Sequence, residues 1–252
     1  MVIALFGLSN HHFSSLNSRG KASQNSFQLT TSTTPCPSAG PHAEPRPVSA
    51  ASLLAARESI RRLRLDLIEM LRISLRAVDC ATKAYALGLV EFALHAPSGQ
   101  KKLEHLNQTI NATTQELYEK GELDDRQLSL SESARAISAA LLSMCQQAYE
   151  ISSHTVTLLR GGIHHSTKEL VRLGEHVDCS LRLCVAAFMK QRVEYAEVVL
   201  NSMKNPWRQG YTAPVVRASD VHEWSIAVSL KEMMDNLCIV AMASTIAIPL
   251  SA

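Results

Sequence analysis

The residues best placed to bind a metal ion lie just after a pair of glycines. His164 and His165 follow Gly161–Gly162, and His165 and Glu169 are four residues apart, so they would share one helix face. Imidazole and carboxylate groups are ordinary zinc ligands. However, both histidines precede the expected helix, and His176 lies two turns further along it. This spacing favours a solvated helix start over a set of metal ligands.

A second possible metal site is a carboxylate cluster inside a helical bundle of the ferritin type. Glu232 and Asp235 form a carboxylate pair in the last helical segment, but no Glu-x-x-His pattern occurs on two facing helices, as such a site requires. The sequence also has no HExxH, GxSxG or phosphate-loop pattern. We therefore expect no catalytic residues, no enzymatic activity and no cofactor, and keep the ferritin-type metal protein as the alternative.

A run of arginines near residue 60 is the strongest charged feature of the chain. The run has six arginines set against the three acids Glu58, Asp66 and Glu69, and the arginines are Arg57, Arg61, Arg62, Arg64, Arg72 and Arg76. One interpretation is an ordinary solvated helix face with internal pairs between residues four apart. The other is a docking surface for an acidic partner protein or an anionic membrane. A second candidate for contact with a partner is Trp207, an aromatic residue in an irregular stretch between helices.

The amino-acid composition limits the classes of protein to which this chain can belong. The formal net charge is +2 in 252 residues, which gives no support to nucleic-acid binding by gross charge. Aromatic residues make up 5% of the chain, fewer than a β-sandwich or barrel usually has, while Leu, Ala, Glu and Arg favour helices. No run approaches the length of a membrane span. The six cysteines show no CxxC spacing and are interpreted as free thiols in a reducing compartment, which predicts a cytoplasmic protein.

The first 50 residues form a separate block. They are rich in Ser, Thr and Pro and contain a single acid, Glu44. Such a segment cannot bury enough apolar surface to offset the entropy lost on ordering, so residues 1–50 are predicted to be disordered. An organelle transit peptide has a similar composition and is one alternative. A mis-assigned upstream start codon is the other.

The remainder of the chain reads as six helical segments and no strand. The first carries a stripe at steps of three and four, including Leu63, Leu67 and Met70, and is expected to continue to Leu94. Breaks are expected at residues 95–99, 121–125 and 161–162, with Ser98 and Ser166 as N-caps. The expected segments are 51–94, 100–120, 131–160, a helix from about 166 that carries its apolar face to Phe188, a short and kinked continuation at 193–203, and 219–246, the last ended by Pro249. The predicted fold is all-α, with two consecutive antiparallel three-helix bundles at residues 51–161 and 162–252.

Three stretches of this helical region resemble the PhoU family, in particular the PhoU-like domain that follows the membrane part of bacterial sodium/phosphate cotransporters. The first runs from Ala55-Ala-Arg-Glu-Ser-Ile-Arg-Arg-Leu to Ile68-Glu-Met-Leu-Arg-Ile-Ser-Leu and is similar to the family's opening helix. The second runs from Lys101-Lys-Leu-Glu-His-Leu to Leu128, and the third from Leu173-Gly-Glu-His-Val-Asp to Val193-Glu-Tyr-Ala-Glu. The resemblance covers residues 51–247.

The resemblance also implies a metal-binding pattern on the closing helix of each half, and this chain departs from it. Tyr149 and Ser153 stand where the family has Glu and Asp in the first half, and only His154 is kept. In the second half Lys231 replaces the Glu, and Asp235 remains. A lysine at a ligand position opposes cation binding. We therefore do not assign the family's metal site, and His154 and Asp235 stay as the two residual candidates.

The function that the resemblance implies is a non-enzymatic regulatory or accessory domain of phosphate transport. It would act by docking on a phosphate transporter or sensor subunit at the inner face of the cell membrane. The predicted partner-binding residues are Arg57, Arg61, Arg62, Arg64 and Trp207. Further predicted partners are an anionic membrane surface and a second copy of the chain. No nucleic-acid partner is expected.

Overall fold

A computed structural model describes residues 50–120, 124–162, 166–203 and 221–250. The chain divides into two units, residues 1–46 and residues 47–252, and all described residues belong to the second unit. The predicted disordered segment therefore lies, apart from Ala50, outside the described residues. Within the described ranges every element is a helix and there is no strand, so the predicted all-α class is confirmed.

The described helices follow one another along the chain. They are α1 (Ala50–Leu87), α2 (Val90–His95), the short 3-10 helix η2 (Ala96–Gly99), α3 (Gln100–Lys120), α4 (Asp125–Arg160), α5 (Lys168–Lys190), α6 (Val193–Met203) and α7 (Val221–Leu250). The predicted boundary between the two halves, after residue 161, falls at the turn that ends α4.

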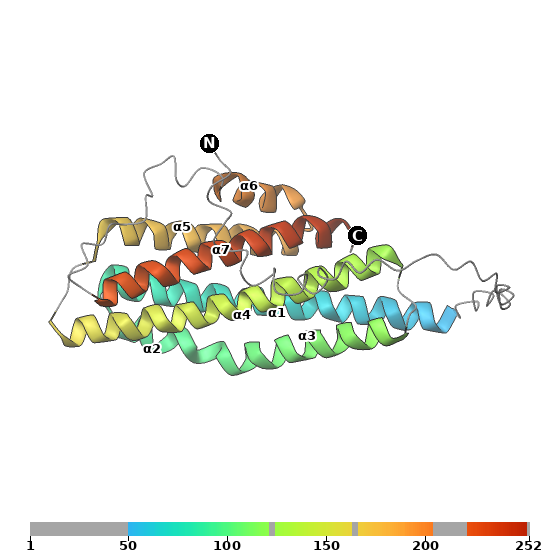
Figure 1. The fold of residues 1–252 in the computed structure, drawn as a ribbon, viewed down its shortest axis with the longest axis horizontal. Helices are drawn as coiled ribbons and strands as arrows, with labels where there is room; N and C mark the ends of the chain where they lie inside the picture. Colours follow the sequence, from blue (N-terminus) through green and yellow to red (C-terminus); the bar gives the residue numbers. More distant parts are fainter. Residues whose placement is uncertain (1–49, 121–123, 163–165, 204–220, 251–252) are drawn as a thin grey trace, which may run out of the picture. The chain divides into compact units, whose positions relative to one another are not determined.

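Four long helices form the centre of this unit (Figure 1). Helix α7 packs on α4 and α5, and α1 packs on the same two helices, so α1 and α7 occupy opposite corners. Helix α3 covers α1 and α4 on one side, and α6 covers α5 and α7 on the other. The first half thus contributes α1, α3 and α4, and the second half contributes α5, α6 and α7. Each half has the three-helix arrangement expected from the sequence.

The stripes of the sequence pattern form the core. Leu63, Leu67 and Met70 of α1 are buried, as are Leu141 of α4 and Leu181 of α5. Burying a Leu or Met side chain stabilises a fold by about 1.5–3 kcal/mol. These residues belong to a single hydrophobic core to which both halves contribute.

Several helix ends differ from the sequence prediction. Helix α1 ends at Leu87 because Gly88 adopts a positive φ of +65°, which an L-residue rarely does, so the predicted continuation to Leu94 is wrong. Ser98 lies inside η2 and does not cap α3. Helix α4 begins at Asp125, earlier than predicted, because the Asp124 carboxylate accepts a hydrogen bond from the backbone N–H of Gln127 at 2.7 Å.

The second half shows two further differences. The N-cap of α5 is Thr167, and Ser166 donates instead to the Ala86 carbonyl at 3.5 Å, so the predicted capping box is wrong. Helix α7 includes Pro249 in its last turn. The predicted stop at Gly161–Gly162 is confirmed, with Gly162 at a φ of +80°. The expected kinked continuation is a separate helix, α6, because Gln191 at the end of α5 adopts the left-handed conformation.

Charged side chains join α1 to α5 across the boundary between the halves. The Arg182 guanidinium of α5 lies 2.7 Å from Asp79 of α1 and also contacts Asp178 through two nitrogens, at 2.7 and 3.2 Å. Lys83 contacts Asp79 at 2.8 Å. Two carboxylates and two cations share these contacts, and the contact of Arg182 with Asp79 links α5 to α1.

Two sequence features that bear on the cellular compartment, the lack of a membrane-spanning run and the free cysteines, can be compared with the structure. In the described part of the chain, no helix combines the length and apolar character that crossing a membrane requires. The five described cysteines are free; Cys80, Cys145 and Cys184 are buried. Burial raises the pKa of the Cys184 thiol to about 12, so this group behaves as a small apolar side chain.

Candidate functional site

Two histidines from opposite halves face each other where α4 and α7 meet. Nδ1 of His154 lies 2.9 Å from Nδ1 of His222, and the ring centroids are 5.2 Å apart. One of these nitrogens must carry a proton and the other must accept it. Burial, together with the charge of His222, lowers the pKa of His154, while Glu150 one turn earlier opposes this shift. The contact between the two rings therefore joins the two closing helices.

A polar cluster lies close to the same end of the bundle. The Tyr85 hydroxyl donates to Glu223 at 2.9 Å, and the Thr167 hydroxyl donates to the same carboxylate oxygen at 2.8 Å. The backbone N–H of Thr167 donates to the Tyr85 oxygen at 3.0 Å. Burial raises the pKa of Tyr85 to about 12. The cluster therefore links α1, the start of α5 and α7 through donors and acceptors that satisfy one another.

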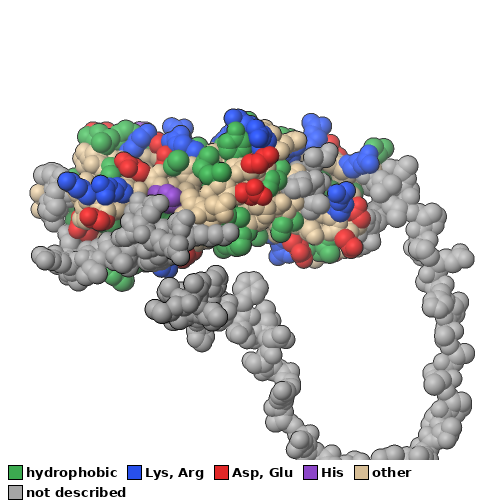
Figure 2. Space-filling view, turned by 90° about the horizontal axis from the view of Figure 1, so that it is seen from above, with side chains coloured by type: hydrophobic (Ala, Val, Ile, Leu, Met, Phe, Trp, Pro, Cys, Tyr) green, Lys and Arg blue, Asp and Glu red, His purple; other side chains and the backbone are tan. Residues whose placement is uncertain are grey.

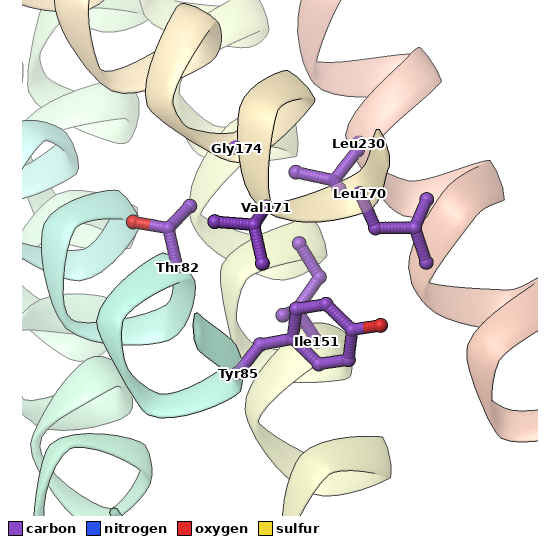
Figure 3. A pocket seen from close by; sticks show the side chains of 7 residues that line it. All are labelled: Thr82, Tyr85, Ile151, Leu170, Val171, Gly174 and Leu230. Atoms are coloured by element: carbon purple, nitrogen blue, oxygen red, sulfur yellow. The ribbon is translucent and has the colours of Figure 1, made fainter. Parts of the chain in front are cut away.

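A small pocket adjoins Tyr85 (Figure 3). Its lining includes Thr82, Gly174 and Leu230 from three different helices, and the space inside it admits about one water molecule. The pocket is thus a packing gap where α5 approaches α1, too small for a metabolite.

The predicted basic surface divides into exposed and internal arginines. Arg57 is exposed, and Arg61 and Arg62 are each 73% exposed and lie 3.7 and 3.5 Å from Glu58. Arg64 differs, since its guanidinium donates to the Phe188 carbonyl near the end of α5 at 3.4 Å. A cation there interacts favourably with the negative end of α5. Three of the four predicted arginines therefore point to solvent, and Arg64 is held against α5.

Charge is mixed elsewhere on the surface. On the face drawn in Figure 2, basic and acidic side chains are interspersed with hydrophobic ones. Trp207, the remaining predicted partner-binding residue, lies outside the described residues.

Comparison with known proteins adds one relationship. No family model matches the chain, and no curated protein sequence is similar to it. Among solved structures, the chain is similar to the crystal structure of PhoU from Pseudomonas aeruginosa, with a TM-score of 0.61 and 15% sequence identity. The match covers 77% of this chain and 95% of that chain. The chain has a PhoU-like fold.

The metal positions implied by the resemblance to PhoU do not form a metal cage in this chain. The carboxylate of Asp235 forms an ion pair with Lys231, whose ammonium group lies 3.1 Å away. His154 contacts His222, which lies thirteen residues before Asp235, roughly 20 Å along the helix axis. In the described ranges no group of three or more His, Cys, Asp and Glu side chains could hold an ion. The residues present do not fit the metal site, and the ferritin-type alternative gains no support.

One surface of this PhoU-like fold was not identified from the sequence. Trp224 is 56% exposed on α7, and Ile239, Met242 and Ile246 are also exposed on that helix. The available signal was the even spread of apolar residues around α7, which has no clear polar face. A helix of this composition usually has a partner on every side.

Proposed function

We propose that this chain is a non-enzymatic regulatory or accessory protein of phosphate transport that acts by docking on a transporter or sensor subunit. The observation that carries the proposal is the PhoU-like fold, matched over 77% of the chain. The three stretches that resemble the PhoU-like domain of sodium/phosphate cotransporters favour that setting. A cytoplasmic location at the inner face of the cell membrane follows from the same resemblance.

The proposed docking surface is the exposed basic part of α1. Arg57, Arg61 and Arg62 lie within two turns, and the contacts of Arg61 and Arg62 with Glu58 are long and exposed to solvent. Exposed pairs of this kind contribute about 0–1 kcal/mol, so an acidic partner displaces Glu58 easily. An arginine can bind a carboxylate or phosphate through two parallel hydrogen bonds. The surface therefore suits an acidic protein segment, and an anionic membrane is the further proposed partner.

Arg64 and Trp207 complete the proposed surface in different ways. Arg64 holds α5 against α1 through the Phe188 carbonyl and so orients the helix that carries the other three arginines. Trp207 is proposed as an apolar anchor for the partner. A second copy of the chain is another proposed partner.

The docking proposal is tested with charge reversals that leave the core intact. Deleting α1 would remove buried Leu63, Leu67 and Met70, so its effect could not be attributed to docking. The variant R57E/R61E/R62E reverses three exposed charges, and K101E/R126E/R172E is a matched control with three exposed cations on other helices. Both should retain the helical circular dichroism of the wild type.

The measurement is binding of each purified variant to detergent-solubilised phosphate transporter and to phosphate-sensor subunits. We expect the α1 variant to lose binding by about tenfold or more and the control to bind like the wild type. Vesicles of phosphatidylglycerol measure the membrane contribution separately. Binding by the α1 variant equal to that of the wild type would contradict the assignment of this surface.

A further inference from the structure

Cations of the second half gather where α5 ends and α6 begins. In the turn between these helices, Lys190 and Arg192 lie on either side of Gln191 in the chain. The Nζ atom of Lys190 is 5.2 Å from the centre of the Tyr195 ring, and the guanidinium carbon of Arg192 is 5.7 Å from it. A cation over the face of a tyrosine is attracted by the negative charge of the ring. Tyr195 therefore holds two like charges close to one turn.

Two arginines of α1, in the first half, reach the same turn. Arg64 donates to the Phe188 carbonyl at 3.4 Å, and the side-chain amide of Gln191 lies against its guanidinium. Arg72 donates to Sδ of Met189 at 3.7 Å. Arg64 and Arg72 are eight residues apart, about 12 Å along the helix axis, yet they contact neighbouring residues of α5. Their side chains therefore lean towards each other.

The arginines at this turn have fewer acidic partners than the arginine two turns earlier in α5. That residue, Arg182, lies 2.7 Å from both Asp79 and Asp178. Among the described residues, no carboxylate lies within ion-pair distance of Arg64 or Arg72. A thioether is a weak acceptor, so the sulfur contact of Arg72 leaves its charge uncompensated.

One carboxylate of the described chain contacts the turn. Arg192 lies 3.4 Å from Glu194, and these side chains are exposed by 58% and 65%. An exposed ion pair of this kind is weak, so a more strongly charged anion can replace the carboxylate. Four cations from both halves, set against this one acid, leave an excess of three positive charges.

The two helix ends at the turn also favour an anion. The guanidinium of Arg64 occupies the carbonyl end of α5, which would otherwise repel a negative charge. Helix α6 begins at Val193, and the N-terminal end of a helix carries a partial positive charge. An anion at the turn therefore meets the positive end of α6, while the negative end of α5 is already compensated.

We propose that these four residues, the turn cluster, bind a soluble oligophosphate, an anion with two or more linked phosphate groups; they are Arg64, Arg72, Lys190 and Arg192. A single phosphate group carries a charge of about −1.5 to −2 at pH 7, which is less than the excess of the cluster. A guanidinium binds phosphate oxygens through parallel hydrogen bonds, and an ammonium binds them as a point charge. Linked phosphates supply both the charge and the oxygens that four cations bind.

The position of Arg64 favours a small soluble anion over a membrane. Its side chain is half-buried between α1 and α5, whereas Lys190 and Arg192 are exposed. A flat bilayer would meet the exposed cations first, while a phosphate chain can follow the turn to the half-buried guanidinium. The site is separate from the docking surface at Arg57, Arg61 and Arg62 and does not depend on it.

The test measures binding of sodium tripolyphosphate to the full-length protein by equilibrium dialysis. We expect a dissociation constant below about 100 μM for the wild type, and binding of orthophosphate at least about tenfold weaker. R72Q/K190Q removes one cation of the cluster from each half, and the dissociation constant for tripolyphosphate should rise by about tenfold or more. K101Q/R126Q removes one exposed lysine and one exposed arginine from α3 and α4, and this matched control should bind like the wild type.

Substitutions of Tyr195 test the gathering of the two cations at the turn. Tyr195→Leu removes the ring, so the dissociation constant for tripolyphosphate should rise by about threefold. Tyr195→Phe keeps the ring and loses only the hydroxyl, so this variant should bind like the wild type. Circular dichroism melts of every variant check that the fold is retained.

The outcomes decide the proposal in either direction. Binding of tripolyphosphate that R72Q/K190Q weakens and K101Q/R126Q leaves unchanged supports the turn cluster. Absence of binding at about 1 mM tripolyphosphate overturns it, and so does an equal loss in both double variants, because gross charge would then be responsible. Orthophosphate that binds as tightly as tripolyphosphate also overturns it. So does wild-type protein that binds phosphatidylglycerol vesicles but not tripolyphosphate, since the cluster would then serve a lipid.

Failure of this proposal can be told apart from failure of the docking proposal. R72Q/K190Q leaves Arg57, Arg61 and Arg62 in place, so its binding to phosphate-transport subunits should equal that of the wild type. The variant R57E/R61E/R62E, conversely, keeps all four residues of the turn cluster. Each proposal is therefore tested by a variant that leaves the other surface intact.

Discussion

The Tyr85 hydroxyl lies 2.9 Å from the Glu223 carboxylate and joins α1 to α7, the two helices at opposite corners of the central bundle. The two residues are 138 positions apart in the chain. Thr167, at the start of α5, donates to both groups through its backbone and its side chain. One buried phenol thus connects the first half of the PhoU-like fold to two helices of the second half.

Replacing Tyr85 with Phe should destabilise the protein. With a pKa raised to about 12 by burial, Tyr85 remains a hydrogen-bond donor at neutral pH. The Phe variant loses the bond to Glu223 and leaves the Thr167 N–H without its acceptor, so we expect the free energy of unfolding to fall by about 1–3 kcal/mol. Urea denaturation followed by circular dichroism measures this. The exposed Tyr149→Phe is the control, and equal stabilities of the two variants would show that the cluster contributes nothing.

Stability should fall as the pH drops from about 7 to 5, in part through His154. Burial and His222 lower the pKa of His154, so the unfolded chain binds a proton more readily than the folded protein. Stability is therefore complete above the unfolded pKa of about 6.5 and decreases as the pH falls through it towards the lower folded pKa. Burial lowers the pKa of His176 as well, which acts in the same direction.

His154→Gln removes one of these two contributions. We expect the variant to show a smaller loss of stability between about pH 7 and 5 than the wild type, measured by urea denaturation at each pH. Exposed His95→Gln is the matched control. An identical pH dependence in His154→Gln and the wild type would remove His154 from the explanation.

Gly99→Ala should destabilise the turn between α2 and α3. An added Cβ at this position would overlap the Cγ2 methyl of Ile73 on α1, which is attached close to the backbone and cannot move far. Overlap of this kind typically costs about 1–3 kcal/mol. Ile73→Leu removes the Cγ2 branch, so Gly99→Ala should cost less in that background. Equal costs in both backgrounds, measured by chemical denaturation, would rule out this contact as the cause.

Asp79→Asn should weaken the junction of α1 with α5. Asp79 is 22% exposed and contacts Lys83 and Arg182, so the substitution leaves Arg182 with Asp178 as its remaining acidic partner among the described residues. We expect a loss of about 1 kcal/mol in the free energy of unfolding, and a smaller loss in high salt, which screens the wild-type contacts. Glu194→Gln, from an exposed pair, is the control and should change stability less. A loss that does not vary with salt would mean that packing, not charge, is responsible.

Much of the fold could be predicted because helical periodicity is local. The stripe of Leu63, Leu67 and Met70 identified a buried face, and each of these residues is buried. Gly161–Gly162 identified the end of α4, since Gly162 supplies the positive φ that the turn needs. The break at Gly88 was missed because the apolar pattern continues through it. The cap at Asp124 was missed although the Asp-x-x-Gln signature was present in the sequence.

The candidate sites were harder to predict, because they depend on which faces meet. Ser166 had the spacing of an N-cap, but α5 starts at Lys168 and its N-cap is Thr167, whose hydroxyl donates a hydrogen bond to Glu223. Arg64 belongs to the same basic run as Arg61, but it lies beside α5 and donates a hydrogen bond to the Phe188 carbonyl. Sequence spacing shows where each side chain lies on its own helix, but it does not show which side chains of other helices it contacts.

By itself the sequence determined that the described part of the chain forms long helices with defined stops and no strand, since composition, spacing and glycine positions act within a few turns of chain. Only the tertiary structure decided that Tyr85 meets Glu223, that His154 meets His222, and that Lys231 and Asp235 face outward together on α7. The physical reason is that an apolar stripe shows which side of a helix must be buried but not which other helix will cover it. The covering helix is determined only when all the helices pack together, and this packing also determines which polar side chains of the two halves come into contact.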